Sequence, residues 1–429
     1  MRLIYSCFFY LITPLLLLKL WRRGKQAPAY RQRIGERFGF AEKTSETAPL
    51  WVHAVSVGEV VAITPVLKQL LVCYPELPIL VTTSTPTGAD RVAKLFKDFP
   101  QLWHQYCPYD QPGAVSRFLT RQRPLGLLIV ETELWPNMLA KCAARGIPVM
   151  LANGRMSEKS AAGYAKVSVL SKPMLRQISL LVAQYKIDGD RFTQLGLPAE
   201  NLLISGSIKF DLEIDAKIPA KVQLLREQIG ARPVLILGSS HESEEYGVLE
   251  QMAALWQSQP NLLLIIVPRH PERFKAVAEL AGNYSSQVLK RSESAPNKTC
   301  QIYIGDTMGE LGMLYAVADV AIVGGSFISV GGQNPIEPAS VATAVLMGPE
   351  QYNFSVICPA LEAAGGMRSV ADYAALQVQL QALFAAPERI TAMSNSAKAH
   401  VESQRGATQI LLHSIERVLL ATLEKNTAH

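Results

Sequence analysis

The residue of this chain best placed to do chemistry is Glu59, in the stretch Leu50-Trp-Val-His-Ala-Val-Ser-Val-Gly-Glu-Val-Val. An apolar run typical of a buried strand stops at Ser56, and Gly58 is expected to let the chain turn sharply into a helix. The turn would place the Glu59 carboxylate at a helix N-terminus beside the carboxyl edge of a parallel sheet, where open α/β folds bind ligands. An ionised carboxylate held there suits a general base. The alternative is an acid that only stabilises the first turn of the helix.

Two further charged positions follow apolar runs in the first half of the chain. Glu131 and Glu133 come directly after Leu125–Val130, so they stand at the end of a predicted strand. Lys209 stands in Ser205-Gly-Ser-Ile-Lys-Phe-Asp, where it can pair with an acid or with an anionic leaving group. Taken singly, these residues are better explained as structural than as catalytic.

In the second half, Pro268-Arg269 follows the apolar run Leu262–Val267. An arginine just past a parallel strand and next to a helix start can bind a phosphate bidentately. His270 and Glu272 are too close in sequence to make a good pair of metal ligands. We therefore favour a phosphate over a metal at this junction.

Two more junctions between loop and helix lie further along. Asn334-Pro335-Ile336-Glu337 follows two glycine pairs, which let a ligand approach the backbone. Asn334 is expected to cap the helix, with Pro335 at the first helical position and Glu337 in the first turn. Gly309-Glu310-Leu311 is the other junction. For the Asn334 segment the alternative is a well-capped helix that binds no ligand.

Apolar runs alternate with helical patterns along the chain, which is typical of βαβ units with parallel sheets. The fold class is therefore α/β, with two Rossmann-like domains facing an inter-domain cleft, and the polar stretch Asp211–Pro219 is the expected linker. We expect a membrane anchor over 1–25, a first domain over 26–212, a second over 213–405, and a C-terminal helix over 406–429 that packs back on the first domain. The predicted strands are Leu50–Val55, Ile79–Thr83, Leu125–Val130, Val149–Ala152, Leu180–Ala183, Leu202–Ser205, Val234–Leu237, Leu262–Val267, Gln301–Ile304, Val320–Val323 and Ala344–Met347.

Composition narrows the class of protein. A chain of 429 residues exceeds a usual single core, so two domains are expected. The net charge of +6 comes without a long basic block or a basic stripe interleaved with aromatics, which argues against nucleic acid as a partner. The six cysteines are scattered and lie in no C-x-x-C, so we interpret them as reduced thiols in the cytosol.

The N-terminus has the composition of a membrane anchor. Leu3–Leu18 carries no charge and is followed by Trp21 and a basic cluster, whereas a cleaved signal peptide has its charge before the apolar core. The positive-inside rule puts the body of the protein in the cytoplasm. The run is shorter than the roughly 20 residues of a comfortable span, and it contains Pro14. A single span, insertion into one leaflet and an ordinary buried helix therefore all stay open.

Some chemistries are disfavoured by what the sequence lacks. There is no G-x-G-x-x-G after a strand and no G-x-x-x-x-G-K-[ST], which weakens dehydrogenase and P-loop interpretations. Asp188-Gly-Asp190 resembles a metal-binding D-x-D but stands at a predicted helix start, where we expect it to be an N-cap. No metal site is predicted.

Taken together and in this order, the segments resemble the 3-deoxy-D-manno-octulosonic acid (Kdo) transferases of lipopolysaccharide synthesis, nearly from end to end. The segments that carry the resemblance are the apolar N-terminus followed by Ala27-Pro-Ala-Tyr-Arg31, Ser56-Val-Gly-Glu59, Thr85-Pro-Thr-Gly88, Glu131-Thr-Glu-Leu-Trp-Pro136, Ser207-Ile-Lys-Phe-Asp211, Val267-Pro-Arg-His-Pro-Glu-Arg-Phe274, Gly305-Asp-Thr-Met-Gly-Glu-Leu311 and Asn334-Pro-Ile-Glu337.

The resemblance implies a GT-B glycosyltransferase that moves Kdo from CMP-Kdo to a lipid A precursor (lipid IV-A) at the cytoplasmic face of the inner membrane, without a metal or cofactor. It implies that Glu59 is the proton acceptor and that Glu131 and Lys209 stabilise the transition state. One departure is Gln333, where some relatives are expected to have histidine, and it puts a contact behind the site in doubt. The residues that the resemblance assigns to CMP binding are Pro268, Arg269, Gly309, Glu310, Leu311, Asn334, Pro335, Ile336 and Glu337.

The residue chemistry agrees with this assignment. Displacement of CMP from an anomeric carbon passes through an oxocarbenium-like state, and an inverting transfer needs one base on the acceptor hydroxyl, which suits Glu59. The departing phosphate needs positive groups or helix N-termini, which suits Arg269 and the glycine-rich junctions. The alternative enzyme is a sugar-nucleotide 2-epimerase of the same architecture, which needs no anchor. A membrane-anchored binding protein would have no need of Glu59.

Overall fold

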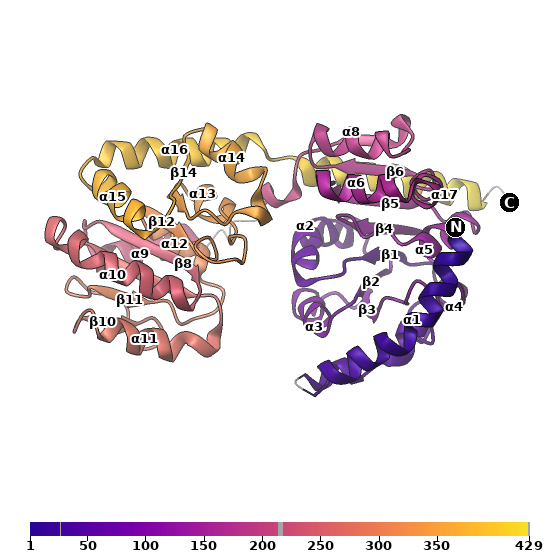
Figure 1. Cartoon of the computed structure of the whole chain (residues 1–429), viewed down its shortest axis with the longest axis horizontal. Coiled ribbons are helices and arrows are strands. Elements are labelled where there is room, and N and C mark those ends of the chain that lie inside the picture. The colour runs from indigo at the N-terminus through magenta and orange to yellow at the C-terminus, as the bar shows by residue number, and fades with distance from the viewer. Residues whose placement is uncertain (26, 213–217, 428–429) are drawn as a thin grey trace. The chain divides into compact units, whose positions relative to one another are not determined.

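The computed structural model describes residues 1–25, 27–212 and 218–427, which form two compact units (Figure 1). Unit 1 comprises Met1–Asp211 and Arg405–His429, and unit 2 comprises Leu212–Gln404. The linker predicted over Asp211–Pro219 falls mostly on 213–217, which lie outside the described residues. Each unit is built on a parallel sheet of seven strands, so the α/β fold class is confirmed.

The sheet of unit 1 has the order β3-β2-β1-β4-β5-β6-β7. Successive residues of its central strands point to opposite faces, so Leu50 and Val52 join one apolar cluster and Trp51 joins another on the other face. Both faces are therefore buried under helices. The strands are β1 Leu50–His53, β2 Ile79–Thr83, β3 Leu102–Tyr106, β4 Gly126–Val130, β5 Val149–Gly154, β6 Leu180–Ala183 and β7 Leu202–Ile204.

The last helix of the chain, α17 (Ala407–Thr427), belongs to unit 1. Its buried leucines share one apolar cluster with α2 (Val57–Cys73), the helix that carries Glu59. Asp211 fixes the start of α17, because its carboxylate accepts hydrogen bonds from the backbone N–H of Gly406 (2.7 Å) and Thr408 (2.6 Å). The other helices of unit 1 are α1 Arg2–Arg23, α3 Pro86–Leu95, α4 Pro112–Gln122, α5 Pro136–Ala143, α6 Glu158–Lys166, α7 Ser168–Leu175 and α8 Lys186–Gln194, with short 3₁₀ turns η1 Pro28–Arg31, η2 Ile34–Phe38, η3 Ala199–Asn201 and η4 Ile208–Phe210.

Unit 2 repeats this plan with the strand order β10-β11-β9-β8-β12-β13-β14. Two buried apolar clusters again lie on opposite faces of the sheet. The strands are β8 Val234–Ser240, β9 Leu263–Pro268, β10 Val288–Lys290, β11 Ile302–Ile304, β12 Val320–Val323, β13 Ala344–Met347 and β14 Met367–Ser369. The helices are α9 Ile218–Ile229, α10 Glu242–Ser258, α11 Phe274–Gly282, α12 Leu311–Val317, α13 Ile336–Ser340, α14 Ile357–Ala363, α15 Tyr373–Phe384 and α16 Pro387–Ser403, with 3₁₀ turns η5 Pro271–Arg273 and η6 Tyr352–Phe354.

All the predicted strands are present, with ends that differ by up to three residues. Three strands were not predicted: β3, β10 and β14. Each lies at an edge of its sheet. These three edge strands are short or carry polar residues, so they lack the apolar run of a central strand, whereas the fourth edge strand, β7, is apolar over Leu202–Ile204 and was predicted.

Candidate functional site

Glu59, Glu131 and the Asn334 segment follow strands between which the strand order of a sheet reverses, whereas Arg269 follows β9 and Gly309 follows β11. In unit 1 the order reverses between β1 and β4, and in unit 2 between β8 and β12. Ligands of open α/β sheets bind at these switch points, beyond the carboxyl ends of the strands. Glu59 follows β1 and Glu131 follows β4, so the switch point of unit 1 presents two carboxylates.

Glu59 stands in the first turn of α2 and is 9% exposed. Its carboxylate accepts hydrogen bonds from the Val55 backbone N–H (2.7 Å) and from the Ser56 hydroxyl (2.9 Å). Burial nevertheless raises the pKa of Glu59 to about 7, helped by the negative charges of Glu133 and Glu131. A carboxyl group with this pKa exchanges a proton readily near neutral pH.

The expectation that Gly58 makes the turn before Glu59 is wrong. Gly58 lies inside α2 without a positive φ, and a Cβ there would meet only the Ser56 hydroxyl oxygen, at 3.8 Å. The turn is made by Ser56, which is extended at φ −122° and ψ 169°.

Glu131 and Lys209 lie together as an ion pair. The Lys209 Nζ is 3.3 Å from Glu131 Oε1, and the Arg155 Nε is 3.7 Å from Glu131 Oε2. Glu131 has a left-handed backbone, with φ 59°, and its N–H donates to the Ala152 carbonyl. A positive φ at a residue other than glycine is a strained conformation that clusters at functional sites. Arg155, which follows β5 and lies near the second oxygen of Glu131, was not among the predicted site residues.

Asn153 connects this ion pair to the sheet. Its side-chain oxygen accepts the Ile208 N–H at 3.3 Å, and its carbonyl accepts from Gln184. Ile208 is buried and begins the turn η4 that carries Lys209. The position of Lys209 is therefore set by the burial of Ile208 and by the hydrogen bond that the Ile208 N–H donates to Asn153 at the end of β5.

At the switch point of unit 2, the residue that organises the loop after β12 is Glu244. It is fully buried, and its carboxylate accepts the backbone N–H groups of Gly325 (2.7 Å), Ser326 (3.0 Å) and Phe327 (3.1 Å). It also accepts the N–H of His241 (3.1 Å), which completes a capping box at the start of α10. Glu244 was not among the site residues predicted from the sequence. The spacing of a capping box was the available signal, but the three long-range donors have no local pattern.

Pro268 is the last residue of β9 and Arg269 follows it, where the Arg269 N–H donates to the Ser240 carbonyl. The Arg269 side chain is exposed and lies close enough to Glu337 to lower the pKa of that acid, which burial raises. Asn334 donates to Glu337 Oε1 at 3.2 Å. The structure thus brings Arg269, Asn334 and Glu337 together.

The capping expected at Asn334 is displaced by one residue. Pro335 is the N-cap of α13 and Ile336 is its first helical residue, while the Asn334 side-chain oxygen accepts the Ile336 N–H from one position further out. Gly324, in the first of the two glycine pairs before this segment, is required by the fold itself, because a Cβ there would collide with the Ser239 carbonyl.

Gly309, Glu310 and Leu311 follow β11, which pairs with β9. Gly309 has φ 86°, a conformation that glycine adopts without strain. Glu310 accepts two hydrogen bonds from the Arg291 guanidinium, both 3.0 Å, which lower its pKa. The Glu310 carboxylate is therefore already paired with an arginine of unit 2.

Within the described ranges 1–25, 27–212 and 218–427, no group of three or more His, Cys, Asp or Glu residues is arranged to hold a metal ion. Asp188 is not an N-cap as expected. Tyr185 caps α8, and Asp188 in its first turn accepts the Met156 N–H at 2.7 Å.

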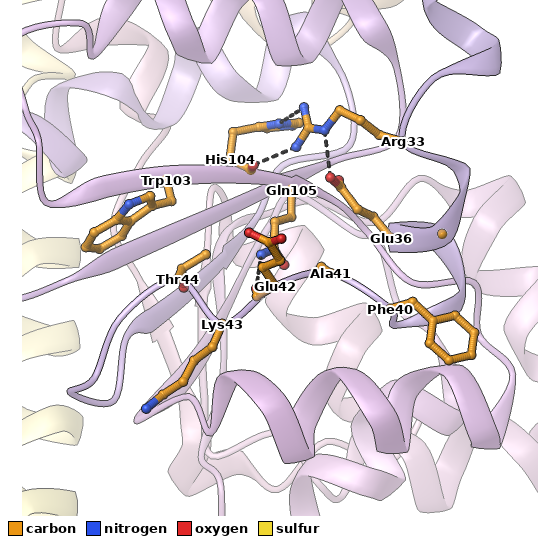
Figure 2. A pocket seen from close by; sticks show the side chains of 11 residues that line it. Arg33, Glu36, Phe40, Ala41, Glu42, Lys43, Thr44, Trp103, His104 and Gln105 are labelled. Atoms are coloured by element: carbon orange, nitrogen blue, oxygen red, sulfur yellow. Dashed lines mark hydrogen bonds and ion pairs between the residues drawn. The ribbon is translucent and has the colours of Figure 1, made fainter.

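A hollow of about 580 Å³ lies beside the edge strand β3, and its lining residues include none of the predicted site residues (Figure 2). The arginine that lines the hollow already has hydrogen-bond partners in unit 1, because Arg33 donates to Glu36 (2.7 Å) and to the His104 carbonyl (2.7 Å). Burial, with the nearby Arg33 and Arg37, lowers the pKa of His104 to about 3. The hollow is therefore not included in the candidate site.

Comparison with known proteins identifies the family. Residues 32–212 match the family model described as 3-deoxy-D-manno-octulosonic-acid transferase (kdotransferase). The chain is 39% identical to the 3-deoxy-D-manno-octulosonic acid transferase of Haemophilus influenzae, over 97% of this chain and 99% of that protein. The chain belongs to the Kdo transferase family. The Kdo transferase of Bordetella pertussis is 36% identical over the same shares of the two chains.

Solved structures confirm the two-domain architecture of this family member. A UDP-GlcNAc 2-epimerase from Neisseria meningitidis covers 87% of the chain with a TM-score of 0.58 at 13% identity. A glycosyltransferase from Rickettsia africae covers 88% with a TM-score of 0.54 at 12% identity. The GT-B type fold is therefore shared by enzymes of both classes, and it is the sequence relatives that separate a glycosyltransferase of lipopolysaccharide synthesis from an epimerase.

Proposed function

We propose that the chain transfers Kdo from CMP-Kdo to a lipid A precursor (lipid IV-A), with release of CMP and inversion at the anomeric carbon. The acceptor hydroxyl oxygen bonds to the anomeric carbon of Kdo as the bond from that carbon to the CMP phosphate oxygen breaks. The hydroxyl proton passes to Glu59. No covalent enzyme intermediate and no metal take part.

The observation that carries this proposal is the state of Glu59. Its carboxylate is buried at a switch point and its pKa is raised to about 7, so near neutral pH it is ionised in a large fraction of molecules and basic enough to accept a proton. A carboxylate has about four lone-pair positions, and the two local donors leave room for an acceptor hydroxyl.

The charged groups around Glu59 suit the other demands of the transfer. We assign Glu131 and Lys209 to stabilisation of the transition state, because their ion pair fixes opposite charges beside the base. On the donor side we assign Pro268-Arg269, Gly309-Glu310-Leu311 and Asn334-Pro335-Ile336-Glu337 to CMP binding. Arg269 has an exposed guanidinium that suits the phosphate, and the Glu337 carboxylate suits the ribose hydroxyls.

We assign acceptor binding and donor binding to the two domains expected from the sequence. We propose that the domain over 26–212, with the C-terminal helix over 406–429, binds the acceptor and carries the base, and that 213–405 binds CMP-Kdo. The apolar segment 1–25 would hold the enzyme at the cytoplasmic side of the inner membrane. Its helix α1 is the one helix in the described part of the chain that is long and apolar enough to cross a membrane.

The test is to incubate the detergent-dispersed full chain with CMP-Kdo and lipid IV-A and to measure CMP release and the mass of the lipid. We expect release of CMP with a mass gain of one or more Kdo residues, unchanged by EDTA. Absence of the mass gain would refute the proposal, and loss of activity in EDTA that Mg²⁺ restores would refute its metal-free part. A parallel incubation with UDP-GlcNAc tests the epimerase alternative, which predicts a changed sugar and no lipid product.

A further inference from the structure

Helix α1 is bound to the rest of unit 1 along one of its faces by polar side chains. The Ser6 hydroxyl donates to the side-chain oxygen of Asn137 (3.1 Å), and Gln111 Nε2 donates to the Thr13 hydroxyl (2.5 Å). One turn away, the Tyr10 hydroxyl accepts the backbone N–H of Gly113 (3.2 Å). The first half of the helix is thus joined to α5, to Gln111 just before α4 and to the first turn of α4 (Figure 1).

The same face contributes to the folded core of unit 1. Phe9 is 8% exposed and packs edge-on against Trp135, with ring centroids 6.4 Å apart. Tyr5 makes a side-chain hydrogen bond to Asp110, whose carboxylate also accepts the N–H groups of Asn137 (2.9 Å) and Met138 (2.7 Å) at the start of α5. The contact of α1 therefore shares its partners with the N-terminus of a core helix.

The opposite face of α1 carries exposed apolar side chains. Leu3 is 81% exposed and Leu11 is 76% exposed. With successive helical residues about 100° apart, the exposed apolar side chains cover an arc of about 140°, while Tyr5, Ser6, Phe9 and Thr13 lie on the opposite arc. The exposed face, which we call the lipid face, consists of Leu3, Ile4, Phe8, Leu11, Leu15, Leu18 and Trp21.

The lipid face is bordered by features that suit a membrane surface. Trp21 has two cations over its ring, Lys25 at 5.1 Å and Arg31 at 4.9 Å from the centroid. Lys19, Arg22 and Arg23 are exposed in the same region, where anionic headgroups attract such residues. At the other end, exposed Val169 of α7 lines a hollow of about 310 Å³ with Met1 and Leu3, which extends the apolar surface onto the body of unit 1.

We infer that α1 lies in the plane of a membrane that contains anionic lipids, with its lipid face inserted into one leaflet and its other face bound to unit 1, and that it does not span the bilayer. This inference rests on the membrane attachment proposed above. Spanning would pull residues 5–13 away from unit 1. It would also place the hydroxyls of Tyr5, Ser6 and Thr13 in hydrocarbon and leave Asn137 and Gln111 without these partners.

The depth of individual residues in the bilayer tests the orientation. Single cysteines at Ile4, Phe8, Leu11, Leu15 and Leu18, in a chain with Cys7→Ser and Cys73→Ser, would carry nitroxide labels on exposed positions that leave the fold intact. The proteins would be bound to vesicles of phosphatidylethanolamine and phosphatidylglycerol. Depth follows from the relative access of oxygen and of a water-soluble nickel reagent, with a label at exposed Lys275 of unit 2 as the aqueous reference.

We expect all five labels at similar depths within one leaflet. A spanning helix would instead change depth by about 21 Å between Ile4 and Leu18, at about 1.5 Å per residue, and would carry the labels through the midplane. Labels shielded from both reagents would mean that another protein copy covers the face. Either result, or failure to bind the vesicles, would overturn the inference, and Kdo transfer measured on the same samples tests the proposed chemistry separately.

A cross-link tests the contact with unit 1 independently. Ser6→Cys paired with Asn137→Cys should be joined by a short thiol reagent while the protein is bound to vesicles, and the joined enzyme should keep its transfer activity. The matched control is Leu11→Cys with Asn137→Cys, which places the first thiol on the lipid face and should not be joined. Equal cross-linking of the two pairs, or none in the first, would contradict the docked helix.

Discussion

Glu59 in unit 1 and Glu244 in unit 2 occupy the same place in their domains. Each is the third residue of the helix that follows the first strand of its sheet, and each turns its carboxylate back toward the start of that helix. Glu59 receives two local donors, whereas Glu244 receives four, three of them from the loop after β12.

The number of donors decides what each carboxylate does. Four N–H groups compensate Glu244 for its burial, so it becomes a fixed part of the fold. Two donors leave Glu59 under-compensated, and burial raises its pKa to about 7. One position of a repeated βαβ plan thus supplies a structural support in one domain and, in the mechanism that we propose, a proton acceptor in the other.

The largest expected effect is the loss of Kdo transfer when Glu59 is replaced. Glu59→Gln should lower the turnover of CMP-Kdo by roughly 10²–10⁴-fold, because the amide cannot accept the proton. CMP affinity, measured by titration calorimetry, should stay the same, since Glu59 belongs to unit 1. The neighbouring acid gives the matched control: Glu133→Gln should lose far less activity, and equal losses would remove the special role of Glu59.

Replacement of Glu244 should lower the stability of unit 2. Glu244→Gln keeps one oxygen acceptor but turns an NH₂ group toward backbone donors, and each buried N–H left without a partner costs about 1–3 kcal/mol. We expect the unfolding of unit 2 to shift to lower urea concentration while that of unit 1 does not move. CMP binding should weaken with it, because the loop 325–327 loses its support. An unchanged unit 2 transition would show that the loop is held by other contacts.

Arg269→Ala should weaken CMP and CMP-Kdo binding by a similar factor, about 10-fold to 100-fold, which corresponds to the loss of a charged hydrogen bond. Calorimetric titration of both ligands checks this. Arg273→Ala is not a suitable control, because Arg273 pairs with buried Glu245, whereas exposed Lys275→Ala on the following helix should leave both affinities unchanged. Retained affinity in Arg269→Ala would take that residue out of the donor site.

The smallest effect concerns the stability of unit 1. The pKa of Glu59 is raised in the folded state, so its contribution to stability is present below about pH 4.5 and is lost as pH rises through about 7. Glu59→Gln removes this loss, and at pH 8 the variant should gain about 1–3 kcal/mol relative to wild type when both are compared with pH 5. Urea unfolding of unit 1 at the two pH values measures the difference. A variant that follows the wild-type pH dependence would show that burial does not raise the pKa of Glu59.

The sequence predicted the central strands and the position of Glu59 because both depend on local patterns. Apolar runs mark strands that are buried on both faces, whereas edge strands such as β10 have no such run. The role of Glu244 was missed because three of its four donors lie 81 to 83 residues away in the chain. Similarly, the docked face of α1 carries Phe9 between Ser6 and Thr13, so in a hydropathy profile it merges with the lipid face into one apolar run.

The pH dependence of kcat/KM for Kdo transfer tests the role of Glu59 most directly, because kcat/KM reports the ionisation of the free enzyme. With lipid IV-A as acceptor, the logarithm of kcat/KM should rise with a slope of one up to about pH 7 and then level off, since the base must lose its proton to act. The residual activity of Glu59→Gln should lack this rise, while Glu133→Gln should keep it. A wild-type profile without the rise, or the same rise in Glu59→Gln, would contradict the assignment of Glu59 as the proton acceptor.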